Sequence, residues 1–281
     1  MSDATLRLAI DAAVASALKE DWGDAGDITS AASVPPEAQL KAAIRARKPG
    51  TLSSLDIARR AFELTDPAIR VETVAADGDR LEPGETALIV EGPARSILAA
   101  ERVALNFLQH MSGVATATRR LVDAIEGTSA KIVCTRKTTP GLRTFEKRAV
   151  LHGGGANHRF GLYDAVLIKD NHIAAAGGVR EALTRAKAHV GHLVKIEVEV
   201  DDLDQLTEVM AIGCDAVLLD NMAPAALREA LGVIDGRVIA EASGDIREET
   251  VRAVAETGVD RISSGWITHS APALNLGLDA L

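Results

Sequence analysis

Aromatic side chains are scarce in this sequence, which has two Trp, one Tyr and four Phe among 281 residues. Basic residues are also outnumbered by acidic ones, so the net charge is -9. Proteins that bind nucleic acid without base specificity need a basic surface for the phosphates and aromatic side chains on which bases stack. We therefore expect no general nucleic-acid binding.

Cysteine is nearly absent as well. The two residues, Cys134 and Cys214, lie in apolar sequence and form no C-x-x-C or C-x-x-H motif, so a structural zinc site is not expected. No run of about 18 apolar residues occurs, and charged residues interrupt the apolar positions of the first helix. We expect a cytoplasmic protein with no membrane contact, in which both thiols stay reduced.

The length predicts one large unit and one smaller unit. Apolar residues recur at helical spacing from Thr5 to Trp22. From Leu40 to Glu91 short apolar runs alternate with Pro-Gly and Asp-Gly turns, which predicts a small β-rich layer. Helical periodicity returns from Ser96 to Glu126, and we place a boundary near residue 112.

After Gly127, apolar runs typical of strands alternate with helical segments. The predicted strands are 131–135, 165–169, 193–200, 216–220, 237–242 and 261–264, and the predicted helices are 179–190, 203–212, 224–233 and 247–257. This alternation indicates a parallel sheet with crossover helices. A β/α barrel is our first interpretation and a doubly wound open sheet is the second.

Polar residues cluster where the predicted strands end. They are Arg136-Lys137, Lys169-Asp170, Glu199, Asp220, Ser243-Gly244 and Ser264-Gly265. In a barrel all these positions lie on the rim that carries the active site. The two Ser-Gly pairs are suited to hold phosphate, because glycine lets backbone N–H groups approach an anion closely.

The segment from Lys131 to His172 carries eight Lys and Arg against three acidic residues. A solvated basic face would explain such a run. However, Arg136, Lys137 and Lys169 end apolar strands, and His158-Arg159 follows three consecutive glycines. We therefore favour a convergent site for an anionic ligand.

Glu199 and Asp220 lie on the same predicted rim as these cations. They could be salt-bridge partners of the cations. Alternatively, they could accept hydrogen bonds from sugar hydroxyls and ligate a hard cation such as magnesium. The residues alone leave both interpretations open.

Several of these segments together resemble the signature blocks of quinolinate phosphoribosyltransferases, in order and at matching spacing. The blocks are Glu101–His110, Thr135-Arg-Lys-Thr-Thr-Pro-Gly-Leu-Arg143, Gly153-Gly-Gly-Ala-Asn-His-Arg159, Leu167-Ile-Lys-Asp-Asn-His172, Glu197-Val-Glu199, Leu219-Asp-Asn221, Glu241-Ala-Ser-Gly244 and Thr268-His-Ser270. The resemblance spans nearly the whole chain. One departure is Asp245, which places a carboxylate after Ser243-Gly244, beside an expected phosphate loop.

The resemblance implies an incomplete, seven-stranded β/α barrel with a smaller N-terminal α/β domain. We expect the N-terminal domain over 1–111, the catalytic barrel over 112–270, and a tail at about 271–281 that packs back on the first domain. It also implies Mg²⁺ as cofactor and a homodimer with shared active sites, which could assemble further.

The resemblance also assigns roles to individual residues. Quinolinate is expected to bind Arg102 (from the partner subunit), Arg136, His158, Arg159 and Lys169. Phosphoribosyl pyrophosphate is expected to bind Lys137, Glu199, Asp220, Ser243, Gly244, Gly265 and His269, with Glu199 and Asp220 holding the metal directly or through water. Lys137, Lys169, Glu199 and Asp220 form the catalytic set.

The activity implied is phosphoribosyl transfer to quinolinate with decarboxylation, which gives nicotinate mononucleotide for NAD biosynthesis. Lys137 or Lys169 would protonate the carbanion that decarboxylation leaves. Two alternatives are a related enzyme of the molybdenum-transport-associated branch and a non-catalytic anion- or nucleotide-binding regulator. The complete quinolinate blocks argue against the first, and the presence of both Glu199 and Asp220 argues against the second.

Overall fold

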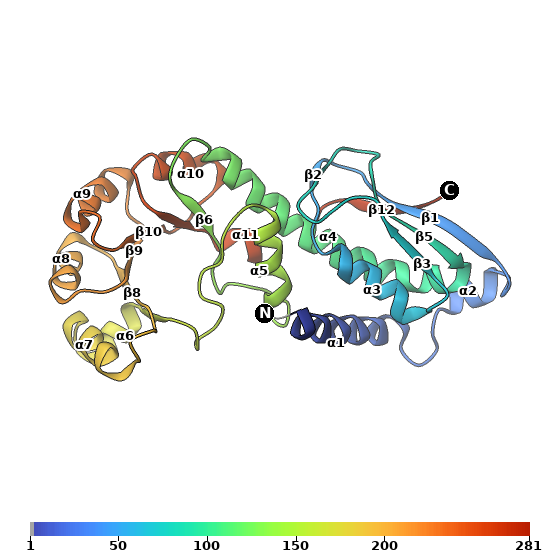
Figure 1. The fold of residues 1–281 in the computed structure, drawn as a ribbon, viewed down its shortest axis with the longest axis horizontal. Coiled ribbons are helices and arrows are strands. Elements are labelled where there is room, and N and C mark those ends of the chain that lie inside the picture. Colours follow the sequence, from blue (N-terminus) through green and yellow to red (C-terminus); the bar gives the residue numbers. More distant parts are fainter. Residues whose placement is uncertain (1–2) are drawn as a thin grey trace. The chain divides into compact units, whose positions relative to one another are not determined.

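The computed structural model describes residues 3–281 and divides into two compact units (Figure 1). The first contains the chain up to Ala117 together with Ala271–Leu281, and the second is Thr118–Ser270. The division falls within helix α4, Ala94–Ala124. No helix of the described residues is sufficiently long and apolar to cross a membrane.

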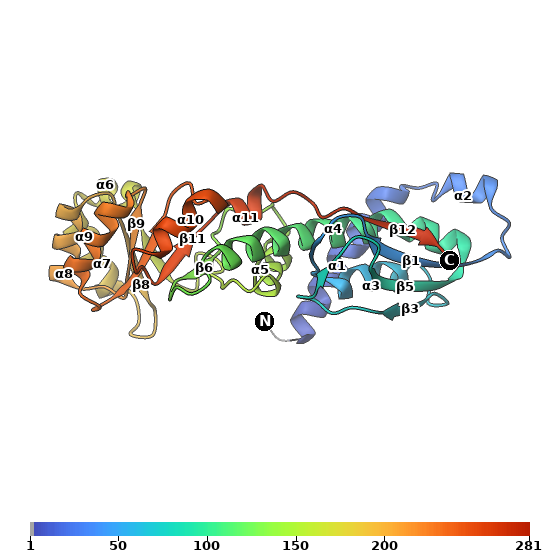
Figure 2. The ribbon, with the colours of Figure 1, turned by 90° about the horizontal axis from the view of Figure 1, so that it is seen from above.

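The first unit is built around a four-stranded antiparallel sheet of order β12-β1-β5-β3. Its elements are α1 (Asp3–Trp22), α2 (Ile28–Ser33), β1 (Gln39–Ala46), β2 (Gly50–Thr51), α3 (Leu55–Thr65), β3 (Arg70–Thr73), β4 (Arg80–Leu81), β5 (Thr86–Pro93), α4 and β12 (Leu276–Ala280). The C-terminal strand β12 pairs with β1 from Ala42↔Ala280 to Ala46↔Leu276 (Figure 2).

The predicted first helix is confirmed, because α1 buries Ile10, Val14 and Leu18 at a spacing of four residues. The prediction of short β-type runs from Leu40 to Glu91 was wrong at α3. Ala58, Ala61 and Phe62 are buried at the three- and four-residue spacing of a helix face, so this segment packs as a helix.

The second unit has a parallel six-stranded sheet of order β6-β11-β10-β9-β8-β7. Its elements are β6 (Lys131–Val133), α5 (Arg143–His152), β7 (Val166–Ile168), α6 (Asp170–Ala176), α7 (Val179–His189), β8 (Ile196–Val200), α8 (Leu203–Ile212), β9 (Ala216–Asp220), α9 (Pro224–Ile234), β10 (Ile239–Ser243), α10 (Glu248–Ala255), β11 (Arg261–Ser263) and α11 (Trp266–His269). All six predicted strands and all four predicted helices are present, and the sequence missed α5, α6 and α11.

A seventh strand position is reduced to one residue. Ala156 forms an isolated parallel bridge with Val133, donates a hydrogen bond to the carbonyl of Ile132 and accepts one from the amide of Cys134. The sheet thus runs from the Ala156 bridge through β6 to β7, with α7, α8, α9 and α10 outside it (Figure 1). This arrangement matches the expected incomplete barrel better than a doubly wound sheet, which has helices on both faces.

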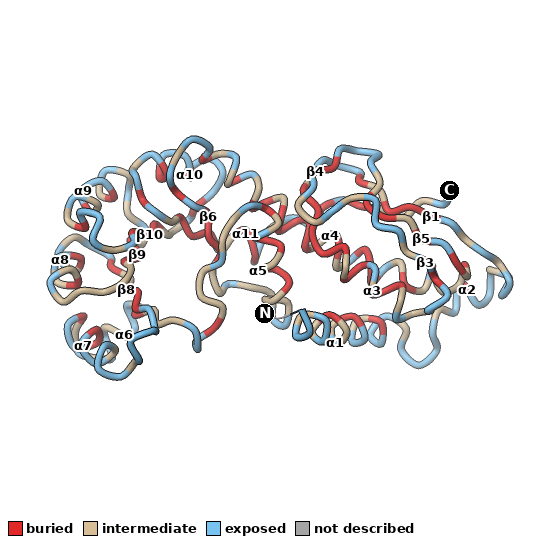
Figure 3. The backbone as a smooth tube through the Cα atoms, viewed as in Figure 1, coloured by how far each residue is buried: buried red, intermediate tan, exposed pale blue. Residues whose placement is uncertain are grey.

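Burial follows from this arrangement. Strand interiors are buried, and each outer helix buries one stripe toward the sheet, for example Leu227, Ala230 and Ile234 of α9 (Figure 3). Because the strands are parallel, their carboxyl ends meet at one edge of the sheet. Polar side chains at those ends can therefore converge without disturbing the apolar core.

Candidate active site

A pocket of about 810 Å³ lies at the carboxyl ends of the strands of the second unit. The predicted site residues that line it are Arg136, Lys137, His158, Arg159, Lys169, Glu199, Asp220, Ser243, Gly244, Gly265 and His269. Arg102, which lies exposed on α4 in the first unit, is not among the lining residues. The structure thus brings together all the predicted residues except this one.

Two arginines of the pocket lack sufficient counter-charge. Burial and the positive charge of Arg136 together lower the pKa of Arg159, despite the partial compensation from Glu197 and Asp164. The Nε atom of Arg136 is buried and has no hydrogen-bond partner among residues 3–281. Like charges held close together with an unused donor favour binding of an anion.

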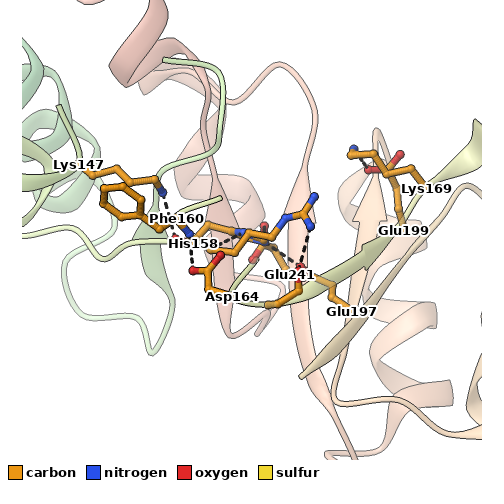
Figure 4. Close-up of polar contacts among 10 residues, drawn as sticks. Lys147, His158, Phe160, Asp164, Lys169, Glu197, Glu199 and Glu241 are labelled. Atoms are coloured by element: carbon orange, nitrogen blue, oxygen red, sulfur yellow. Dashed lines mark hydrogen bonds and ion pairs between the residues drawn. The ribbon is translucent and has the colours of Figure 1, made fainter. Parts of the chain in front are cut away.

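His158 lies with two buried glutamates, of which Glu241 also lines the pocket. Its Nε2 atom is 2.7 Å from Oε2 of Glu197 on β8 and 3.7 Å from Oε1 of Glu241 on β10 (Figure 4). Burial lowers the pKa of His158, but the hydrogen bond to Glu197 and the charge of Glu241 outweigh burial and leave the pKa raised. This cluster belongs to the interior of the barrel, since Glu197 and Glu241 are both buried.

These three side chains have the composition of a metal site, with ligand atoms all within 4.8 Å of one another. The hydrogen bonding argues against one. The backbone amide of Arg159 donates to Nδ1 of His158 at 2.7 Å, so Nδ1 carries the lone pair and Nε2 carries the hydrogen. A metal ion at Nε2 would have to displace this proton, which instead forms the hydrogen bond to Glu197.

Glu241 is the most isolated acid of this cluster. It is 4% exposed, and its Oε1 atom has no hydrogen-bond partner in the described chain. Burial, followed by repulsion from Glu197, raises the pKa of Glu241 to about 7. A carboxyl group near neutrality can be either protonated or ionised at physiological pH.

Lys169, which follows β7, forms an ion pair with Glu199 on β8 (Figure 4). Asp220, at the end of β9, accepts a hydrogen bond from the side-chain Nδ2 of Asn221 at 2.6 Å. Asn221 has a φ of 53°, which the Asn side chain tolerates. The two predicted ribose- and metal-binding acids therefore end adjacent strands of the sheet, each with one oxygen engaged.

The loops after β10 and β11 approach other pocket residues closely. A Cβ atom on Gly244, whose φ is 108°, would lie 2.1 Å from Oδ1 of Asn221, so only glycine fits there. A Cβ atom on Gly265 would lie 2.9 Å from Lys137 and 3.2 Å from His269. Lys137, Gly265 and His269 thus form one corner of the pocket.

The sequence predicted no role for Glu241 and Arg247, which line this pocket, or for Glu197, which contacts His158. Glu197-x-Glu199 and Glu241-x-Ser243 are spaced by two, which places both members of each pair on one strand face. That spacing could have identified the glutamates. Arg247 pairs with Asp245 at 2.9 Å across a loop, and no sequence periodicity reports such a contact.

Comparison with known proteins identifies the family. The family model for the quinolinate phosphoribosyl transferase C-terminal domain matches residues 114–279, and the model for the N-terminal domain matches residues 27–112. The chain belongs to the quinolinate phosphoribosyl transferase family.

Relatives within this family are similar over nearly their full length. A Bacillus subtilis (strain 168) protein named "Probable nicotinate-nucleotide pyrophosphorylase (carboxylating)" is 44% identical over 92% of this chain and 89% of its own. The crystal structure of NadC from Streptococcus pyogenes has a TM-score of 0.92 and 42% identity over 97% of each chain. The nicotinate-nucleotide pyrophosphorylase from Ehrlichia chaffeensis has a TM-score of 0.93 and 38% identity, covering 100% of this chain and 99% of its own.

Proposed function

We propose that this protein transfers the phosphoribosyl group of phosphoribosyl pyrophosphate to quinolinate, with decarboxylation. The products are nicotinate mononucleotide, CO₂ and pyrophosphate, on the route to NAD. The observation that carries the proposal is the under-neutralised arginine pair, because Arg136 and Arg159 converge in a pocket that already holds Lys169. A dicarboxylate supplies the missing negative charge. The activities named for family relatives support the same reaction.

Quinolinate would bind through Arg136, Arg159 and Lys169, with Arg102 supplied by the partner subunit. His158 lies in the same pocket, but both of its ring nitrogens already have partners. It would therefore contact a carboxylate only after exchanging one of these partners for the substrate. Until then, the protonated Nε2 faces Glu197 and not the open pocket.

Phosphoribosyl pyrophosphate would bind to residues on or after β8, β9, β10 and β11, together with Lys137. Glu199 and Asp220 would accept hydrogen bonds from the ribose hydroxyls, while Lys137, Ser243, Gly244, Gly265 and His269 would meet the phosphates. Glu199 and Asp220 also fit Mg²⁺, since each offers carboxylate oxygen, the ligand type that this ion prefers. Bound Mg²⁺ would neutralise pyrophosphate charge and so favour its departure.

The reaction then follows from positioning and charge. Departure of pyrophosphate leaves a ribose with oxocarbenium character, which the quinolinate nitrogen attacks. The cationic ring of the adduct accepts the electron pair of the C–CO₂ bond, so CO₂ leaves. The carbanion at that ring carbon then takes a proton, which we assign to Lys137 or Lys169.

We also propose an oligomeric state and a cellular location for the protein. The protein works as a homodimer, which could assemble further. Arg102 of each subunit enters the active site of the other, and the exposed position of Arg102 on α4 supports this role. The protein works in the cytoplasm, where the unpaired thiols of Cys134 and Cys214 would stay reduced.

Incubation with phosphoribosyl pyrophosphate, Mg²⁺ and either quinolinate or nicotinate tests the proposal. Quinolinate should yield nicotinate mononucleotide and CO₂, whereas nicotinate should be a very poor substrate. The physical reason is that one missing carboxylate leaves a cation unpaired in the pocket, at a cost of several kcal/mol, roughly 2–5. Equal turnover of both acids, or binding of phosphoribosyl pyrophosphate without turnover, would contradict the proposed activity.

A further inference from the structure

Two consecutive residues of α5 are charged and fully buried. Glu146 and Lys147 both have 0% exposure, although charged side chains are seldom fully buried without partners. They are outside the pocket lining. Their partners lie on the two segments that deliver Arg136 and Arg159 to the pocket.

Lys147 connects β6 to the segment that carries His158 and Arg159. Its ammonium group is 3.0 Å from Sγ of Cys134 and 3.0 Å from the carbonyl oxygen of His158, and it lies 5.8 Å from the ring centroid of Phe160 (Figure 4). An ammonium group has three N–H donors, and here a sulfur, a carbonyl and an aromatic face are available as acceptors. Lys147 is therefore anchored on both sides.

Glu146 holds the other segment. Its Oε2 atom accepts a hydrogen bond from the backbone amide of Thr139 at 3.0 Å, three residues beyond Arg136. Arg143, one turn earlier on the helix, joins both segments. It donates to Oγ1 of Thr138 at 3.0 Å and to the carbonyls of Phe160 at 3.3 Å and Arg136 at 3.4 Å.

We propose that Lys147 is a positioning residue for dicarboxylate recognition, and that with Arg143 and Glu146 it fixes the separation of Arg136 and Arg159. This inference rests on the proposed function, because it concerns how the same pocket recognises two carboxylates. Arg143, Glu146 and Lys147 are called the α5 clamp below.

The clamp is needed because the two guanidinium groups repel each other before substrate arrives. Their proximity is evident from the pKa of Arg159, which is lowered by burial and next by the charge of Arg136, while Nε of Arg136 is buried without a hydrogen-bond partner in the described chain. Loops that end in such a pair would move apart unless other contacts hold them. Recognition of two carboxylates at fixed spacing is sensitive to displacements of about 1 Å, which can reduce catalysis about 100-fold. A single carboxylate needs only one of the cations and is indifferent to their separation.

Lys147→Met tests the inference, since methionine fills most of the same volume without the ammonium group. Lys131→Met is the matched control, because Lys131 is an exposed lysine on β6 outside the pocket. For both variants and the wild type, calorimetric titration should give the dissociation constants of quinolinate and nicotinate, and assays should give KM for each substrate. Circular dichroism and Tm report folding.

Lys147→Met should weaken quinolinate binding by about tenfold or more, as expected for displaced recognition groups. Nicotinate affinity and KM for phosphoribosyl pyrophosphate should change by less than about threefold, so the preference for the dicarboxylate narrows. Lys131→Met should match the wild type in every measurement. A folded Lys147→Met protein with unchanged preference, or with equal losses for both acids, would overturn the inference.

Arg143→Met decides the matter if Lys147→Met does not fold, because Arg143 is only partly buried. It should narrow the same preference, by about threefold or more. An Arg143→Met protein with wild-type preference would overturn the inference in that case. Failure of the wild type to bind quinolinate at all would instead refute the proposed function, independently of the clamp.

Discussion

The ammonium group of Lys169 and the carboxylate of Glu199 form an ion pair between the end of β7 and the neighbouring strand β8. Lys169 belongs to the cations proposed for quinolinate, and Glu199 to the acids proposed for ribose and Mg²⁺. The pair therefore joins the two proposed substrate sites directly. Each substrate that binds competes with this contact.

Lys169→Met should lower kcat/KM for quinolinate by about 100-fold, since it removes one preorganised charge from the pocket. The fold should survive, because an ion pair whose lysine is 43% exposed contributes only about 0–1 kcal/mol. Steady-state kinetics and a thermal melt check both parts. Wild-type kinetics in the variant would show that Lys169 only pairs with Glu199 and does not contribute to substrate binding.

Lys137→Ala should fold normally and lose about 100-fold or more in kcat/KM. Lys137 is exposed on the pocket rim and lies beside Gly265 and His269. The phosphates of phosphoribosyl pyrophosphate are proposed to bind at this position. Lys131→Ala, at the start of the preceding strand β6, is the control. An unchanged rate for Lys137→Ala would place this lysine outside the reaction.

Substitutions at Asp245 test whether the loop after β10 binds phosphoribosyl pyrophosphate. The carboxylate of Asp245 pairs with Arg247, which also lines the pocket, so its removal leaves Arg247 free for phosphate. Asp245→Gly should lower KM for phosphoribosyl pyrophosphate by about twofold, and glycine also suits the local φ of 42°. Asp245→Asn separates the charge effect from the backbone effect. A higher KM in both variants would show that Asp245 assists binding, for instance through Mg²⁺.

Glu241→Gln should alter the pH dependence of stability. The folded pKa of Glu241 is raised to about 7, from an ordinary value of 4.5, so the folded state favours the protonated acid. The stabilisation of the folded wild-type protein by the protonated Glu241 is present in full below pH 4.5 and is lost as pH rises to about 7. Glu241→Gln avoids the ionisation, so its stability relative to wild type should rise over that interval by on the order of 3 kcal/mol. Denaturant titrations at several pH values measure it, and a constant difference would contradict the assignment.

Complementation between Arg102→Ala and Lys169→Ala variants tests whether Arg102 acts in the partner's active site. Arg102→Ala and Lys169→Ala homodimers should both be nearly inactive if Arg102 serves the partner's site. A purified mixed dimer has one site with both defects and one with neither, and should regain about half the wild-type rate by symmetry. Co-expression with two different tags yields that species. Mixed dimers as inactive as their parents would assign Arg102 to its own subunit.

The sequence predicted the barrel strands well, because strands such as β9 are apolar runs of a length typical of buried parallel strands. Its predicted rim residues converge because parallel strands end together, a rule that needs no coordinates. The α3 helix escaped detection because nearby Pro-Gly and Asp-Gly turns favoured an all-strand interpretation of that region. The seventh strand position escaped as well, since one bridge at Ala156 leaves no periodicity.

The unpredicted part of the site depends on contacts between distant segments. No spacing in the sequence indicates that Lys147 donates to the carbonyl of His158 and to the sulfur of Cys134. Similarly, the hydrogen bond from the Arg159 amide to His158 fixes a tautomer that composition cannot reveal. Residue types identified which groups are present, whereas only the coordinates show which of them are already engaged.

The pairing of β12 with β1 has a consequence for synthesis of the protein on the ribosome. Because β12 comes from residues 276–280, this edge of β1 has no pairing partner until those residues have been synthesised. Unpaired strand edges are sites of association with other chains. The nascent first unit therefore waits for the second to be made, and a fragment ending at residue 117 would lack the strand that closes its sheet.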